Sequence, residues 1–304
     1  MELLKARERP ELLTVLELLN KRMTLPYLEK QHLTIMSKGF DGEVLLDSLM
    51  ERSISTTIIV INDLSLILGS TPFQIDSILL TSDALYLYEV KNYQGNFTNQ
   101  NSHFLTASGQ DIDNPVNQLN RTAMLLSKVL KKWNVNLPIK SFVVFIHPSF
   151  ILYEAKNSDP FIFPSQIEYH FTTMSRQSGT LTDRIYSIAQ ELIKECQQEL
   201  PYQRQFPSYS FEELKKGLLC SRCGSFDLVV TTKKGDCRAC GTSTPINELF
   251  LSQVEAFKIL FSDKLITSKK MYEWCGEMLT KRRIAALLNA TYEKTSYAKS
   301  THYR

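Results

Sequence analysis

Asp76, Glu89 and Lys91 are the residues whose types and spacing best suit a chemical reaction. Residues 75–80 and 85–90 are rich in Ile, Leu, Tyr and Val, and the polar segment 81–84 between them predicts a β-hairpin with a tight turn. With the turn centred between residues 82 and 83, Asp76 faces Glu89, and Lys91 projects from the same face as Glu89. Opposed β-carbons lie about 5 Å apart, where two carboxylates repel each other unless a cation lies between them. The hairpin therefore predicts a divalent-cation site at its open end.

Such a site suits the hydrolysis of a phosphodiester. Asp76 and Glu89 are expected to hold one or two hard cations, Mg²⁺ or Mn²⁺, through oxygen ligands. A cation there lowers the pKa of a bound water and polarises the phosphate, while Lys91 orients that water or stabilises the transition state. Two further residues, Glu43 and Gln118, lie in the first turns of predicted helices and are candidates to reach the same site. For Glu43 the helix dipole alone is an equally good explanation of its position.

The elements around the hairpin predict a core with αβββαβ order. Leucines at helical spacing predict a helix whose first turn holds Glu43, and Pro115 suits the first turn of a long helix that ends near Trp133. The continuous apolar run 140–147 predicts a strand buried on both faces. The remaining expected elements are strands 56–62 and 64–68 joined by a turn at Asn62–Asp63, a closing helix over 182–200, and one or two helices over 1–36 broken near Pro26.

Several short motifs in this region resemble those of a known family. They are Gly42-Glu43, Gln74-Ile-Asp76, Glu89-Val-Lys91-Asn92 with Gly95 after it, and Pro115-x-x-Gln118. In these motifs residues 38 to about 150 resemble the nuclease-related domain (NERD), a branch of the PD-(D/E)xK nuclease superfamily. The resemblance implies an α/β, restriction-endonuclease-like fold with a mixed sheet. It also implies metal ligands at Asp76, Glu89 and often Glu43, a catalytic Lys91 and a helical glutamine at Gln118.

Four of the six cysteines form two closely spaced pairs, Cys220-x-x-Cys223 and Cys237-x-x-Cys240, each followed by glycine. In a reducing compartment such pairs bind metal more often than they form disulfides. Two such pairs are typical of a zinc ribbon with tetrahedral S4 coordination. A closed S4 site leaves no open position, so this Zn²⁺ is expected to hold the fold and not to activate water.

The C-terminal segment is mildly basic, because residues 246–304 hold ten Lys or Arg and six Asp or Glu. Helical spacing predicts three helices, over 247–261, 268–275 and 281–289. The last begins with Lys281, Arg282 and Arg283, which suits a helix-turn-helix-like unit that binds nucleic acid, and a helical module that contacts protein is an equal alternative.

These observations together predict five segments. They are an N-terminal helical arm (1–37), a nuclease-related domain (38–200), a linker (201–216), a zinc ribbon (217–245) and a helical domain (246–304). No apolar run of about 18 residues and no apolar signal core appear, so a cytoplasmic protein without a membrane contact is expected. The expected function is a Mg-dependent nuclease acting on DNA, with RNA as an alternative substrate. A non-catalytic DNA-binding or replication accessory protein that keeps the nuclease fold is the alternative of another class.

Overall fold

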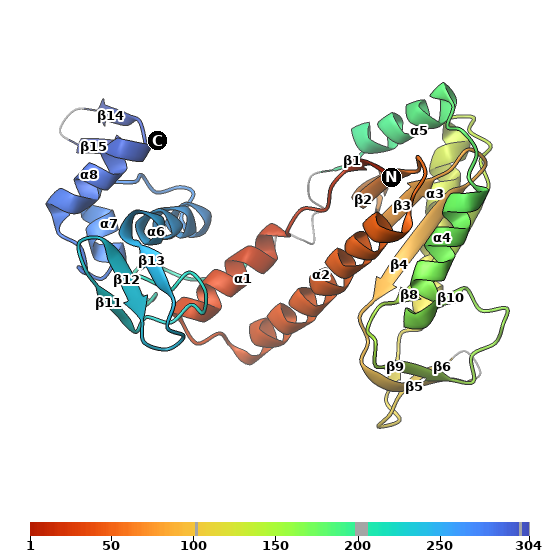
Figure 1. Cartoon of the computed structure of the whole chain (residues 1–304), viewed down its shortest axis with the longest axis horizontal. Helices are drawn as coiled ribbons and strands as arrows, with labels where there is room; N and C mark the ends of the chain where they lie inside the picture. The colour runs from red at the N-terminus through yellow and green to blue at the C-terminus, as the bar shows by residue number, and fades with distance from the viewer. Residues whose placement is uncertain (101–102, 198–205, 298–299, 304) are drawn as a thin grey trace. The chain divides into compact units, whose positions relative to one another are not determined.

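A computed structural model describes residues 1–100, 103–197, 206–297 and 300–303 (Figure 1). The chain divides into two compact units, one built from residues 1–10 and 34–205, the other from 11–33 and 206–304. The division differs from the expected segments, because residues 1–10 join the first unit and residues 11–33 join the second. Residues 201–205 of the expected linker lie outside the described residues.

A mixed six-stranded sheet forms the centre of the first unit, with strand order β1-β2-β3-β4-β8-β10. β2, β3 and β4 are antiparallel neighbours, whereas β1, β8 and β10 pair in parallel with β2, β4 and β8. The strands are β1 (Glu2–Lys5), β2 (Ile59–Leu68), β3 (Thr71–Leu80), β4 (Leu85–Lys91), β8 (Ile139–Phe145) and β10 (Phe161–Ile162). The order of α2, β2, β3, β4, α3 and β8 is the expected αβββαβ core.

Helices cover both faces of this sheet. One face packs apolar side chains of α3 and α5 against the strands, and the other face packs α2 and α4. α3 begins at Pro115 as expected, because the side chain of Asn114 caps it by accepting a hydrogen bond of 3.0 Å from the Val116 amide. The helices are α2 (Tyr27–Ser53), α3 (Pro115–Lys132), α4 (Ile167–Gln177) and α5 (Asp183–Lys194), with a 3-10 turn at Pro164–Gln166 before α4.

A smaller four-stranded sheet follows β4 in the chain, with order β7-β6-β5-β9. Its aromatic side chains continue the main core, since the rings of Phe145 and Phe150 stack with centroids 4.0 Å apart. The strands are β5 (Gly95–Gln100), β6 (His103–Thr106), β7 (Asp111–Ile112) and β9 (Phe150–Tyr153).

β2 and β3 both change phase near the candidate site. Ile61 and Leu64 on β2 pack into the same core cluster although they are three residues apart, and so do Ile75 and Ile78 on β3. A regular strand alternates faces every residue, so each strand must be distorted between these positions. On β2 the distortion lies at Asp63, whose φ of 54° is in the left-handed region. The expectation of two strands joined by a turn at Asn62–Asp63 was therefore wrong, because Asp63 adopts its left-handed conformation inside one continuous strand.

The described part of the second unit combines a small three-stranded sheet with four complete helices, the first residues of α2 and a hairpin. Its core contains buried leucines of α1 and an aromatic group that includes Phe257 and Trp274, whose rings lie 5.8 Å apart. The guanidinium of Arg22 lies 3.7 Å above the Trp274 ring. Its elements are α1 (Glu11–Arg22), β11 (Leu228–Val230), β12 (Lys234–Cys237), β13 (Ser243–Pro245), α6 (Ile246–Leu260), α7 (Ser268–Trp274), α8 (Lys281–Thr291), β14 (Lys294–Tyr297) and β15 (Ser300–Tyr303).

Candidate active site and cysteine cluster

The hairpin of β3 and β4 has the predicted register near its turn, but the predicted pairing of Asp76 with Glu89 does not form. Leu80 pairs with Leu85 and Ile78 with Leu87, and the pairing extends to Ser77 and Tyr88 but no further. Beyond that point Asp76 turns its carboxylate onto the backbone of β4, where its Oδ2 accepts a hydrogen bond of 2.7 Å from the Val90 amide. Asp76 therefore lies beside the end of β4, held by a main-chain donor next to Glu89.

Lys91 lies on the same side of β4 as Glu89, as the alternation of side chains predicts. Its Nζ donates a hydrogen bond of 2.7 Å to Oε1 of Glu89 and another of 2.9 Å to Oε1 of Gln118. Glu89 is buried at 2% exposure. The structure thus brings Lys91, Glu89 and Gln118 together from one strand and the first turn of α3.

Glu43 lies in the interior of α2, so the expectation that it occupies a first turn was wrong and the helix dipole does not explain its position. It approaches the candidate site because Gly42 lets α2 come close to the end of β4. A β-carbon on Gly42 would lie 2.7 Å from Cβ of Asn92 and 3.1 Å from a methyl carbon of Ile146. Asn92 also contacts α2 directly, because its side-chain amide nitrogen donates a hydrogen bond of 2.7 Å to the Lys38 carbonyl. The adjacent pair Gly42-Glu43 therefore has a simple physical explanation, in which the glycine permits the contact that places the glutamate.

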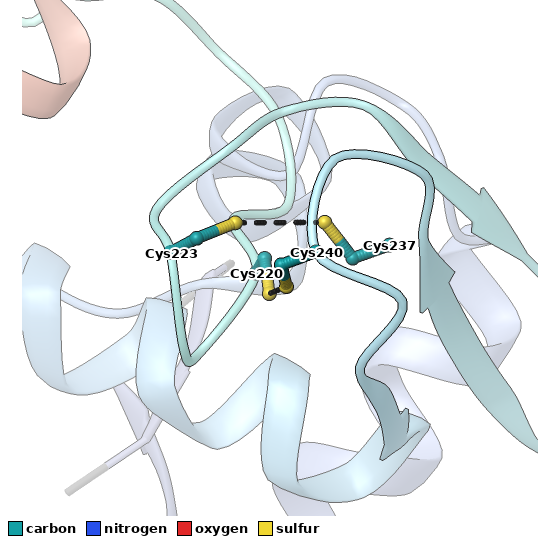
Figure 2. A group of neighbouring side chains, drawn as sticks. All are labelled: Cys220, Cys223, Cys237 and Cys240. Atoms are coloured by element: carbon teal, nitrogen blue, oxygen red, sulfur yellow. Dashed lines mark hydrogen bonds between the residues drawn. The ribbon is translucent and has the colours of Figure 1, made fainter.

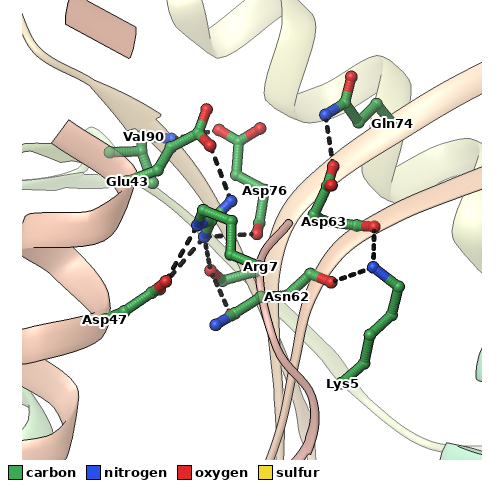
Figure 3. A network of polar contacts seen from close by, with 10 residues as sticks. Lys5, Arg7, Glu43, Asp47, Asn62, Asp63, Gln74, Asp76 and Val90 are labelled. Carbon is green, nitrogen blue, oxygen red and sulfur yellow. Dashed lines mark hydrogen bonds and ion pairs between the residues drawn. The ribbon is translucent and has the colours of Figure 1, made fainter. Parts of the chain in front are cut away.

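Arg7 and Asp47 contact the candidate site, although neither was predicted from the sequence. Arg7 donates to Oε2 of Glu43 at 2.8 Å and to both carboxylate oxygens of Asp47 at 3.0 and 3.2 Å (Figure 3). The spacing of Glu43 and Asp47 was a usable signal, because residues four apart share one helix face. Arg7 gave no such signal, since it comes from a separate segment more than 30 residues away in the chain.

Burial and mutual repulsion make the carboxylates hard to ionise together. Burial, and after it the neighbouring Asp76, raises the pKa of Glu89 to about 8. The same two causes raise the pKa of Glu43 to about 8, with Arg7 opposing them. Burial also raises the pKa of Asp76, against the lowering effect of the Val90 hydrogen bond and of Lys91. A set of oxygen donors that repel one another in this way suits a hard divalent cation.

The four cysteines converge much more tightly than the acids. Their Sγ atoms all lie within 4.8 Å of one another (Figure 2). In the described part of the chain, no other three His, Cys, Asp or Glu side chains bring their ligand atoms this close together. The nearest pairs, Cys220 with Cys240 and Cys223 with Cys237, are separated by 3.6 Å, too far for a disulfide. All four are free thiols.

Two equivalent turns build the cysteine cluster. Gly224 donates its amide hydrogen to the Cys220 carbonyl, and Gly241 donates to the Cys237 carbonyl, both at 2.9 Å. Both glycines have positive φ, 70° and 71°, a conformation that a side chain disfavours. The glycine after each cysteine pair therefore closes its turn, and the cluster is consistent with the zinc ribbon predicted from the sequence.

The basic residues at the start of α8 are exposed. Lys281, Arg282 and Arg283 occupy its first turn, and Thr280 caps the helix by accepting a hydrogen bond of 3.2 Å from the Arg283 amide. Positive side chains in a first turn oppose the helix dipole, so helix stability does not explain their presence. α8 belongs to the second unit and is followed by the hairpin β14–β15, which the sequence analysis did not predict.

The mixed sheet and the acid, acid, lysine arrangement at its strand ends define a restriction-endonuclease-like α/β domain. Residues 38–146 match the family model of the nuclease-related domain, so this part of the chain is a nuclease-related domain, and a cysteine cluster of the zinc-ribbon type lies later in the chain. Neither the curated proteins nor the solved structures contain a match to the chain. No helix in the described ranges is both long and apolar enough to cross a membrane.

Proposed function

We propose that the protein is a metal-dependent nuclease that hydrolyses phosphodiester bonds of DNA. The observation that carries this proposal is the position of Lys91 between Glu89 and Gln118, beside the half-buried Asp76. All four residues lie inside the matched nuclease-related domain. The alternative is that Lys91 and Glu89 form an ordinary surface ion pair at the end of a strand. Such a pair would not require Glu89 to be buried, nor the amide of Gln118 and the carboxylate of Asp76 to lie around the same lysine.

The chemistry of the donor set suits Mg²⁺ or Mn²⁺, although the three carboxylates of the described chain do not all lie within 4.8 Å of one another and must close around the ion. Asp76, Glu89 and Glu43 would hold the ion, since carboxylate oxygens are the ligands that hard divalent cations prefer. When bound, the ion supplies positive charge to the scissile phosphate and to the departing oxygen.

The remaining chemistry belongs to the side chains themselves. An ammonium group has three N–H donors, and Lys91 directs two of them to Glu89 and Gln118. The third is left for an attacking water or a phosphate oxygen. Because Glu89 and Gln118 fix its Nζ before the substrate arrives, Lys91 needs little reorganisation in the transition state.

The rest of the chain is proposed to handle the substrate. The cysteine cluster would bind one structural Zn²⁺, and the ribbon together with Lys281, Arg282 and Arg283 would bind DNA phosphates. Phosphate contacts of this kind position a nucleic acid without reading its sequence.

Cleavage by the purified full chain tests the proposal. Plasmid, linear duplex, single-stranded DNA and RNA would be incubated with Mg²⁺, Mn²⁺ or EDTA, for the parent chain and for Asp76→Asn and Lys91→Ala. The exposed Lys140 on β8 offers a matched control in Lys140→Ala. We expect metal-dependent DNA cleavage that both site variants lose and the control keeps. Binding of DNA without any cleavage would instead indicate an accessory role, and cleavage of RNA alone would change the substrate.

A further inference from the structure

Arg7 enters the candidate site from outside the matched domain. β1 pairs in parallel with β2, and Lys5 adds hydrogen bonds from its Nζ to the carbonyl oxygens of Asn62 and Asp63 at 3.1 and 2.8 Å. These contacts fix the segment that leads to Arg7. The Arg7 side chain is thereby held between α2 and β3, with only 3% of it exposed.

All three nitrogens of the guanidinium are bound. Besides its bonds to Glu43 and Asp47, Arg7 donates from Nη2 to the carbonyl of Asp76 at 2.9 Å and to Oγ of Ser77 at 3.0 Å. The paired bonds to Asp47 have the fork geometry that makes arginine–carboxylate pairs strong and directional. A buried cation held by so many partners has one arrangement, so it acts as a fixed positive charge.

The net charge of the site matches that of one divalent ion. Four carboxylates, those of Glu43, Asp47, Asp76 and Glu89, face the two fixed cations Arg7 and Lys91. When all four are ionised, the remaining charge is −2, which a single divalent ion neutralises. A fifth acid, Asp63, also raises the pKa of Glu43 and of Asp76, and its carboxylate accepts a hydrogen bond from Gln74 at 2.8 Å. The ammonium group of Lys5 lies on the main-chain carbonyl of Asp63, so counting Asp63 together with Lys5 leaves the charge at −2.

The two carboxylate oxygens of Glu43 face different parts of the site. Its Oε2 accepts from Arg7, while its other carboxylate oxygen points away from the guanidinium on the side of the Asp76 carboxylate (Figure 3). Asp47 has both of its oxygens on Arg7. The oxygens that face Arg7 are therefore those that a second metal ion would need.

We propose that Arg7 takes the place of a second metal ion, so that the site binds one divalent cation through Asp76, Glu89 and the outer oxygen of Glu43. This inference rests on the proposed nuclease function. It deepens that proposal by making a residue outside the nuclease-related domain part of its charge balance.

Counting bound Mn²⁺ tests this inference without substrate. The full chain, first loaded with zinc, would be titrated with Mn²⁺ by calorimetry, and the free ion would be followed by electron paramagnetic resonance. We expect one Mn²⁺ per parent chain and a second one in Arg7→Ala, which frees the oxygens of Glu43 and Asp47. Arg7→Lys keeps the positive charge, so this variant should bind one Mn²⁺ like the parent.

Circular dichroism would show whether Arg7→Ala folds. If it does not fold, the number of Mn²⁺ ions bound by the parent chain still tests the inference. Two Mn²⁺ per parent chain would overturn the inference and leave the proposed nuclease intact. A folded Arg7→Ala variant that still binds one ion, or none, would also overturn it. A parent chain that binds no Mn²⁺ at all would remove the proposed metal-dependent function, and the inference with it.

Discussion

Gln118 lies 2.9 Å from the ammonium nitrogen of Lys91, although the two residues come from a helix and a strand separated by 27 positions in the chain. The amide oxygen of Gln118 holds Lys91 from the side of α3, while Glu89 holds it from its own strand. The orientation of Lys91 thus depends on the first turn of α3. That turn is in turn fixed by Pro115 and the Asn114 cap.

Gln118→Ala should therefore weaken catalysis without weakening the fold. The side chain is exposed, so little packing is lost, but Lys91 would keep only one of its two fixed partners. Misplacing a catalytic group by about 1 Å typically costs up to about a hundredfold, and we expect a fall in kcat of roughly ten- to a hundredfold with KM nearly unchanged. Steady-state cleavage kinetics would measure it. Asn120→Ala, at another exposed position on α3, is the control, and an equal loss in both variants would contradict the role of Gln118.

The raised pKa of Glu89 predicts how stability depends on pH in the absence of a divalent ion. Between its ordinary value and about 8, Glu89 is protonated in the folded chain and ionised in the unfolded chain. The native state then binds more protons, so the free energy of unfolding falls as the pH rises through this range. One such group contributes a slope of at most about 1.4 kcal/mol per pH unit.

Urea unfolding in EDTA-free buffer stripped of Mg²⁺, at several values from pH 5 to 8.5, would show this slope. Glu89→Gln removes one of the titrating groups and should make the slope less steep by up to about 1.4 kcal/mol per pH unit, while Glu43, whose pKa is also raised to about 8, keeps part of it. Added Mg²⁺ should raise the stability most at the alkaline end. An unchanged slope in Glu89→Gln would show that burial does not hold this carboxyl in its protonated form.

Two glycines of α2 offer a matched pair of substitutions. Gly42→Ala would place a β-carbon 2.7 Å from that of Asn92, so α2 must move away from the end of β4 and carry Glu43 with it. Gly39→Ala meets no atom within 4 Å, and a helical Gly→Ala change stabilises by about 1 kcal/mol. We expect Gly42→Ala to lower both the unfolding temperature and Mn²⁺ affinity and Gly39→Ala to raise the unfolding temperature alone. Equal behaviour of the two variants would mean that the contact with Asn92 does not place Glu43.

Local patterns explain which parts of this site the sequence could predict. The register of β3 and β4 followed from period-two alternation around the polar turn at 81–84, and the start of α3 followed from Pro115. The two turns that hold the cysteines followed from their spacing and the glycines after them. In each case the determining contacts lie within a few residues of one another in the chain.

The missed features depend on contacts between distant segments. β1 has only four residues, and neither its pairing with β2 nor the ion pairs of Arg7 leave a periodic pattern. Asp63 resembles a turn residue because aspartate tolerates positive φ, and only pairing along the whole of β2 shows that the strand continues. α2 extends through Gly39 and Gly42, which have low helix propensity, because tertiary packing outweighs that preference.

The cysteine cluster gives the last prediction, which separates the two metal sites. Cys237 is buried at the end of β12, and this strand packs so closely on α6 that a β-carbon on Gly235 would lie 2.5 Å from a methyl carbon of Leu249. Cys237→Ser should reduce bound zinc from about one equivalent to nearly none and lower the unfolding temperature of the second unit, since structural zinc contributes its binding energy to folding. Mn²⁺ binding at Asp76 and Glu89 should persist, because those residues belong to the other unit.

Elemental analysis and thermal melting would measure both effects, with Cys196→Ser, a cysteine outside the cluster, as the control. A Cys237→Ser variant that keeps its zinc and its melting temperature would mean that these four thiols do not form a structural zinc site.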